Sequence, residues 1–303
     1  MENYWQDPLF KKIALTVLAI LLLFWILLFP FRKKNPNLAA AFASIQSWII
    51  GAPFFFLLLG LGENYPIYGI TFLSILGAKE FFQITGMFHR SWFVWVTYAF
   101  IGLLGYSATI ENRDLYNVLP MIFLGTIFMI PIIRNSAKYM IQYVCLSLLN
   151  FLMLGWGFMH TAWIAKMENG VFFLIYLIML TEISDNISLS VTRMFAKIRV
   201  VDRITTRRTL EGILVSICLT LIAAYSLRRL IPDESSQYWL SFAVTALLVG
   251  SLGDLVLAVI RRDLGAKDVG AFIIGRGGIL DRLDRLICTS PIYYFVIKYL
   301  GNH

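Results

Sequence analysis

The residues best suited to chemistry lie in one stretch near the end of the chain, from Gly253 to Arg285. It begins as an apolar helix with one acid, Asp254, and closes with Asp281 and Asp284, which share a face if that piece is helical. Mg²⁺ takes oxygen ligands and shares them with substrate phosphates, while cations and glycine-rich backbone hold phosphoryl oxygens. The stretch therefore has the residue types of a metal–phosphate site. The loop between the acids supplies Arg261, Arg262, Lys267, Gly275, Gly277 and Gly278.

This stretch resembles the signature of the phosphatidate cytidylyltransferases (CDP-diacylglycerol synthases), in outline S-x-x-K-R-x4-K-D-x-G-x2-(apolar)-P/G-x-H-G-G-x-x-D-R-x-D. Four positions depart from it: Ala258 replaces Ser, Arg261 replaces Lys, Ile274 replaces Pro or Gly, and Arg276 replaces His. The two substituted cations keep a positive charge, although arginine is not a like-for-like replacement for either residue. The matches in register are Arg262, Lys267, Asp268, Gly270, Gly277, Gly278, Asp281, Arg282 and Asp284.

A second region resembles the S-P-x-K-T-x-E-G element of the same family. Thr209, Glu211 and Gly212 match it, Arg208 stands where Lys is usual, and Thr205-Thr206 replace Ser-Pro. Asp185 matches the acid that the family carries some twenty residues upstream.

Two interpretations of this second region remain open from the residues themselves. Threonine hydroxyls and arginines can grip a triphosphate, and an acid near a helix N-terminus, such as Glu211, is favoured by the helix dipole. The structural alternative is an ordinary helix start with Thr206 as N-cap, after a basic loop that only fixes topology. Beside the C-terminal signature, we favour nucleotide binding.

The resemblance implies a CTP-dependent transfer of CMP to a membrane lipid phosphate, with phosphatidic acid as the expected acceptor and Mg²⁺ as the cofactor. It implies Asp254 and Asp281 as metal ligands, with Asp284 and Asp185 in support. Phosphate oxygens would be held by Arg261, Arg262, Lys267, Arg276 and Arg208, and the nucleotide also by Thr209, Glu211, Gly277 and Gly278. Asp268 is expected to orient the loop.

Composition places this chemistry in a membrane. The 303 residues are 59% hydrophobic and only 15% charged, whereas soluble domains are near half apolar and a quarter charged. The sequence predicts an all-α, polytopic membrane protein of about nine to ten transmembrane helices, without an internal repeat. Segments of about 20 apolar residues fall near 12–31, 39–61, 66–86, 92–110, 115–133, 139–163, 170–190, 211–228, 238–260 and 286–300.

The cations predict an orientation. Most of the 26 Lys and Arg residues fall in alternate loops, and cytoplasmic loops carry such an excess. Both the 193–208 loop and the 253–285 stretch then face the cytoplasm from a cell (inner) membrane, with both termini outside. Cations confined to short loops do not form a nucleic-acid-binding stripe, so we expect no nucleic-acid partner.

Acids inside spans are rare and default to functional hypotheses. Glu80, Glu182, Asp185 and Asp254 each lie toward the predicted cytoplasmic end of their helix, with Glu211 at a span start, so they could converge on one cavity. For Glu80 beside Lys79 we favour a buried or snorkelling pair.

Histidine chemistry is not expected, because His160 lies at the far end of a span and His89 and His303 are in a loop and at the terminus. An anionic phosphate nucleophile needs charge neutralisation rather than a base. The alternative is a catalytically degenerate relative that binds or transports anionic lipid, or an ion-coupled transporter. We expect residues 1–170 to form N-terminal membrane helices and residues 171–303 the catalytic region; a homodimer through apolar faces is plausible.

Overall fold

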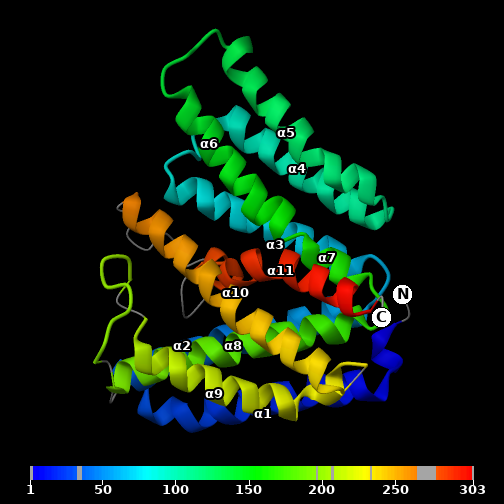
Figure 1. The fold of residues 1–303 in the computed structure, drawn as a ribbon, viewed down its shortest axis with the longest axis vertical. Coiled ribbons are helices and arrows are strands. Elements are labelled where there is room, and N and C mark those ends of the chain that lie inside the picture. Colours follow the sequence, from blue (N-terminus) through cyan, green and yellow to red (C-terminus); the bar gives the residue numbers. More distant parts are fainter. Residues whose placement is uncertain are drawn as a thin grey trace.

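The computed structural model describes residues 3–32, 36–195, 197–205, 208–232, 234–264 and 278–301, and over these residues the chain is helical without a β-strand (Figure 1). The α-helices are α1 (Pro8–Leu28), α2 (Pro36–Gly60), α3 (Tyr65–Ile84), α4 (Ser91–Thr109), α5 (Arg113–Ile133), α6 (Met140–Asn150), α7 (His160–Ala165), α8 (Gly170–Phe195), α9 (Leu210–Ser226), α10 (Ser236–Asp263) and α11 (Leu280–Leu300). A π-helical stretch, η3 (Phe151–Gly157), joins α6 to α7.

The predicted polytopic membrane architecture is confirmed. Seven helical segments of the described chain are long and apolar enough to cross a membrane, and one of them runs through α6, η3 and α7 as Met140–Ala165. The other three predicted spans are also helices. These are α3, the shorter apolar helix α9, and α11.

The helices place the two ends of the chain on one side and the basic segments on the other. In Figure 1 the N and C labels lie together, and the connection from α8 to α9 and the C-terminal end of α10 lie at the opposite side. This is the relative arrangement expected from alternating loop charge.

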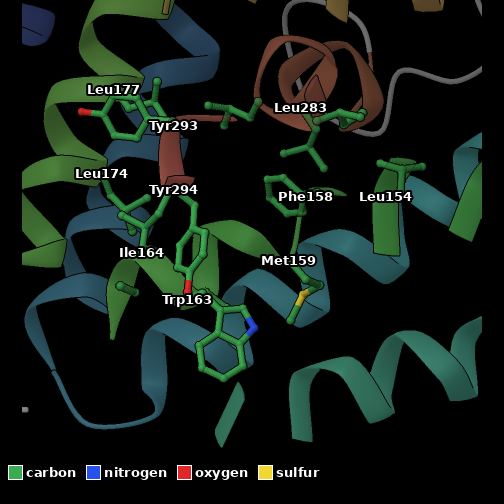
Figure 2. Close-up of a cluster of buried hydrophobic side chains, with 14 of the residues drawn as sticks. Leu154, Phe158, Met159, Trp163, Ile164, Leu174, Leu177, Leu283, Tyr293 and Tyr294 are labelled. Atoms are coloured by element: carbon green, nitrogen blue, oxygen red, sulfur yellow. The ribbon is translucent and has the colours of Figure 1, made fainter. Parts of the chain in front are cut away.

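The interior is built around the C-terminal helix. In Figure 2 side chains of α7, α8 and α11 meet, among them Trp163, Leu174 and Tyr293. Tyr293 is fully buried and its hydroxyl donates to the carbonyl oxygen of Phe173 at 3.3 Å. The middle of α11 is therefore packed against α7 and α8.

Two helix pairs in the C-terminal part approach closely at glycines. A Cβ atom added to Gly253 of α10 would overlap the carbonyl oxygen of Asp284 in α11. A Cβ atom on Gly212 of α9 would lie 2.8 Å from the carbonyl oxygen of Ser188 in α8. These contacts bring the backbones that carry the predicted acids within side-chain reach of one another.

The expected boundary at residue 170 coincides with the start of α8. Elements from both sides of it pack together, since Ser44 of α2 donates to Asn186 Oδ1 of α8 at 3.2 Å.

Candidate active site

Arg208 is the centre of the charged cluster. It directly precedes the residues that start α9, and its side chain is almost completely buried. Its Nε and Nη2 atoms donate to Asp254 Oδ2 at 2.7 and 2.5 Å, and Nη2 also reaches Asp185 Oδ1 at 3.3 Å. The remaining nitrogen, Nη1, donates to Ser188 Oγ at 3.1 Å. The structure thus brings three predicted site residues, from α8, α10 and the loop between α8 and α9, into one contact.

Arg285 of α11 completes this cluster. Its Nη2 atom donates to Asp185 Oδ1 at 2.6 Å and its Nη1 to the carbonyl oxygen of Thr181 at 3.1 Å. Asp185 is therefore shared by two buried arginines. Sequence reasoning did not assign Arg285 a site role, although it directly follows the predicted Asp284 and could have been suspected on that ground.

The acids around Arg208 govern its protonation. Burial alone would lower the pKa of its guanidinium, but the carboxylates of Asp254 and Asp185 outweigh burial, so the pKa lies above its ordinary value. Arg208 is a permanent cation at physiological pH.

Asp281 lies at the start of α11, where it forms an ion pair with Arg261 of α10. Asp284, one turn later, accepts a hydrogen bond from the backbone N–H of Arg285 at 2.6 Å. Arg262, beside Arg261, is exposed. Of the predicted cations and acids in this part of the signature, the structure therefore pairs Arg261 with Asp281 and leaves Arg262 exposed.

The carboxylates of this site are ligands of the kind that a divalent cation prefers. In this structure, however, two of them are paired with arginines. Asp284 lies within electrostatic range of Asp254, Asp185 and Asp281. However, no group of three acidic, histidine or cysteine side chains in the described parts of the chain is arranged to hold a metal. The expected ligand trio of Asp254, Asp281 and Asp284 is not assembled here, because Arg208 and Arg261 hold two of its members.

Thr209 and Glu211 have structural partners. Thr209 is the N-cap of α9: its Oγ1 accepts from the N–H of Gly212 at 3.2 Å and lies 2.9 Å from Thr192 Oγ1. The structural alternative for this region named Thr206 as the N-cap, and the N-cap is instead Thr209, three residues later. Glu211 accepts from the N–H of Ile198 at 3.2 Å, which fixes the loop before α9.

Several predicted positions cannot be placed. Lys267, Asp268, Gly270, Ile274, Gly275, Arg276 and Gly277, with Thr206 of the second element, lie outside the described residues. Gly278 is described and buried, and it packs against Glu80 of α3.

A second polar cluster, which sequence reasoning did not assemble, lies beside the first. Glu182 Oε2 of α8 accepts from Trp48 Nε1 at 2.8 Å and lies 3.6 Å from Arg282 Nη1. Arg282 also donates to Ser47 Oγ. Two features of the sequence could have indicated this cluster. Arg282 matches the signature, and Glu182 is an acid inside a predicted span.

Two apolar cavities meet at this second cluster. One, of about 670 Å³, lies between α1, α2 and α8; the other, of about 180 Å³, lies between α2, α3, α8 and α11. Trp48 and Glu182 line both cavities, and Arg282 and Arg285 line the smaller one. Charged side chains of both clusters, Arg285 of the first and Glu182 and Arg282 of the second, thus line apolar cavities.

Comparison with known proteins finds relatives of this chain. Residues 42–300 match the model of the "Cytidylyltransferase family". The chain is 30% identical over 145 residues to "Uncharacterized protein YnbB" of Escherichia coli, covering 46% of this chain and 49% of that protein. It is 31% identical over 112 residues to a phosphatidate cytidylyltransferase of Thermotoga maritima, covering 35% and 42% of the two chains. It is 27% identical over 185 residues to one of Staphylococcus haemolyticus, covering 60% and 69%. The chain spans about half the length of the first two relatives.

Proposed function

Because the chain belongs to the cytidylyltransferase family, we propose that it transfers CMP from CTP to a membrane lipid phosphate. Phosphatidic acid is the proposed acceptor, and CDP-diacylglycerol and pyrophosphate are the products. Residues 171–303 supply the catalytic region in this proposal. The observation that carries it is the buried arrangement of Arg208 between Asp254 and Asp185, which are three residues that the family resemblance selects.

The reaction needs positioning and charge neutralisation more than proton transfer. A phosphate oxygen of the lipid attacks the α-phosphorus of CTP, a new P–O bond forms, and the bond from the α-phosphorus to the bridging oxygen breaks as pyrophosphate leaves. The nucleophile is already anionic, so no general base is required. Fixed cations in a site that excludes water stabilise the negative charge on the transferring group.

Arg208 is the residue best placed to provide that cation. Its guanidinium group is buried and forms ion pairs with Asp254 and Asp185. The planar guanidinium can bind two phosphate oxygens at once. Arg261 and Arg262 at the end of α10, with Lys267 and Arg276 outside the described residues, are proposed to hold the β- and γ-phosphates.

Mg²⁺ would be held by Asp254, Asp281 and Asp284, and it would supply positive charge to neutralise the phosphate oxygens. For these carboxylates to bind it, Arg208 and Arg261 must release Asp254 and Asp281. The arriving triphosphate offers both arginines replacement oxygens. Arg208 and Arg261 would then exchange their carboxylate partners for phosphate oxygens when the nucleotide binds.

The acceptor lipid would enter laterally from the bilayer. Its acyl chains suit the larger apolar cavity between α1, α2 and α8, which is lined by Val17, Phe24, Ala41 and Ile183. Its phosphate would then lie near Glu182 and Arg282, toward the acids of α10 and α11. Trp48 and Glu182, which line both cavities, lie between this proposed acyl-chain space and Arg282 and Arg285 in the smaller cavity.

We further propose that the site faces the cytoplasm from a cell (inner) membrane. The cation excess in the loops at that end supports this orientation, and CTP is supplied there. The homodimer stays a prediction, to be tested by the mass of the protein in detergent.

The test supplies the purified protein in detergent with Mg²⁺, α-labelled CTP and a panel of lipid phosphates. The proposal predicts a labelled lipid with phosphatidic acid. A labelled product with another lipid phosphate only would change the acceptor. A folded protein that labels no lipid, and whose melting temperature CTP with Mg²⁺ does not raise, would instead support a degenerate lipid-binding relative.

A further inference from the structure

Glu80 of α3 makes a contact that the proposed chemistry does not use. Its side chain is buried, and both carboxylate oxygens accept hydrogen bonds from consecutive backbone amides at the start of α11. Ile279 N–H donates to Oε1 at 2.9 Å and Leu280 N–H donates to Oε2 at 2.8 Å. The interpretation of Glu80 as one half of a buried pair with Lys79 did not include this contact.

These amides have no partner within their own helix. The first N–H groups of an α-helix lack intrahelical acceptors and need a cap, and the cap residue of α11, Ile279, has no side chain that can serve. A negative charge at this end is also favoured by the helix dipole. Glu80 therefore supplies the missing cap from another helix, 199 residues away along the chain.

One glycine just before α11 and one on α3 shape the contact. A Cβ atom on Gly278 would overlap the Glu80 carboxylate, so a side chain at this position would displace the carboxylate from the amides that it caps. On α3, a Cβ atom at Gly77, one turn before Glu80, would lie 3.2 Å from Leu283 Cδ1. The start of α11 is thus fitted against α3 on two successive turns.

The capped turn carries the predicted metal ligands. Asp281 directly follows Leu280, and Asp284 lies one turn further along. Their direction relative to Asp254 depends on where α11 begins and how it is rotated. We propose that Glu80 is a positioning residue that fixes the first turn of α11 and so aims Asp281 and Asp284 at the reaction centre. The catalytic part of this inference rests on the proposed function.

The sharpest variant is Glu80→Gln, which keeps the size of the side chain but replaces one acceptor oxygen with an NH₂ group facing a backbone N–H. Only a carboxylate offers an acceptor to both amides. The matched control is Asn150→Ala. Asn150 Nδ2 donates to the carbonyl oxygen of Ala78, also on α3 and also buried, but this bond does not involve α11.

Three quantities are measured on the full chain in detergent: amide hydrogen exchange of Ile279 and Leu280, kcat, and KM for CTP. Glu80→Gln should accelerate exchange at both amides and lower kcat about 100-fold, as expected when reacting groups are displaced by about 1 Å, with KM for CTP nearly unchanged. Asn150→Ala should lower the melting temperature without changing exchange at these amides or kcat. If Glu80→Gln does not fold, Glu80→Asp, which keeps two acceptors on a shorter stem, is measured instead and should show the same changes.

Unchanged exchange at Ile279 and Leu280 would overturn the capping role. A loss of kcat no larger than that of Asn150→Ala would overturn the positioning role. If the unmodified protein forms no CTP-dependent product, the proposed function and the catalytic part of the inference fail together, and hydrogen exchange still decides whether Glu80 caps α11.

Discussion

Arg208 places two of its nitrogens on a single oxygen of Asp254, Nε at 2.7 Å and Nη2 at 2.5 Å. The two residues are 46 positions apart in the chain, and both side chains are largely shielded from solvent. An arginine bound this way neutralises the acid, and it can exchange that partner for a phosphate group of similar geometry. The contact therefore represents the site before nucleotide binding in our account.

Replacing Asp254 with Asn tests this relationship. The amide keeps the shape of the side chain but removes its charge, so both the proposed metal ligand and the partner of Arg208 are weakened. We expect kcat/KM for CTP to fall at least about 100-fold, the scale of removing one electrostatic contact in an active site. Steady-state kinetics in detergent measure it.

The matched control is Asp263→Asn, at the exposed end of the same helix. It removes the same charge outside the cluster and should keep nearly full activity. Equal losses in both variants would assign the effect to net charge and not to the site.

The stability of the cluster should be insensitive to moderately alkaline pH. The pKa of Arg208 is raised because Asp254 and Asp185 outweigh its burial. A raised pKa means that the stabilisation is complete below the unfolded-state pKa and is lost only as pH rises through the folded-state pKa, which for this arginine lies in strongly alkaline solution. The charged contact should thus persist from about pH 8 to about pH 10.

Arg208→Lys provides the comparison, because the ordinary pKa of lysine is about 10.4. Its melting temperature should fall relative to that of the unmodified protein as pH rises above about 10.4, because the stabilisation by a lysine is lost from its unfolded-state pKa upward. Thermal unfolding in detergent at several pH values measures this difference. Parallel curves for the two proteins would contradict the assignment of Arg208 as the charge that holds α8 and α10 together.

Gly253 should tolerate no side chain. A methyl group there would overlap the carbonyl oxygen of Asp284, so Gly253→Ala must push α10 and α11 apart. We expect a loss of about 1–3 kcal/mol in the free energy of unfolding, typical of overpacking, together with a loss of activity. Gly102→Ala is the control, since nothing lies within 4 Å of the added atom. If both variants lose a similar amount of unfolding free energy, close packing at Gly253 is not the cause.

The apolar cavity between α1, α2 and α8 should determine affinity for the acceptor lipid. Ala41 lines it, and Ala41→Phe would fill part of the space proposed for an acyl chain. We expect KM for phosphatidic acid to rise about tenfold, since burying several methylene groups stabilises by about 0.8 kcal/mol each, with KM for CTP unchanged. Ala99→Phe, on an exposed face of α4, is the control and should leave both constants alone.

Helix positions were predictable because long apolar segments in a membrane chain have few alternatives to a helix. All ten predicted segments are helical. The gathering of Asp185, Arg208 and Asp254 was predictable in outline, because family spacing and loop charge put them at the same end of the bundle. Their pairing was not, since residue type alone does not say whether an acid faces a metal or an arginine.

Long-range caps were out of reach of sequence reasoning. The acceptors at the start of α11 come from α3, and neither the local sequence of α11 nor the neighbourhood of Glu80 encodes that partner. For a related reason, residue type alone did not identify the N-cap of α9. Thr206 and Thr209 are both acceptable caps by residue type, and the packing of Thr209 against Thr192 of α8 selects between them.

Mass spectrometry of the lipid product tests the central claim most directly. Purified protein is given phosphatidic acid, CTP and Mg²⁺, and the lipid extract is analysed for CDP-diacylglycerol alongside the Asp254→Asn and Asp263→Asn variants. The account predicts this product from the unmodified protein and from Asp263→Asn, and very little from Asp254→Asn. Folded, unmodified protein that forms no CDP-lipid, or an Asp254→Asn variant that forms as much as the unmodified protein, would contradict it.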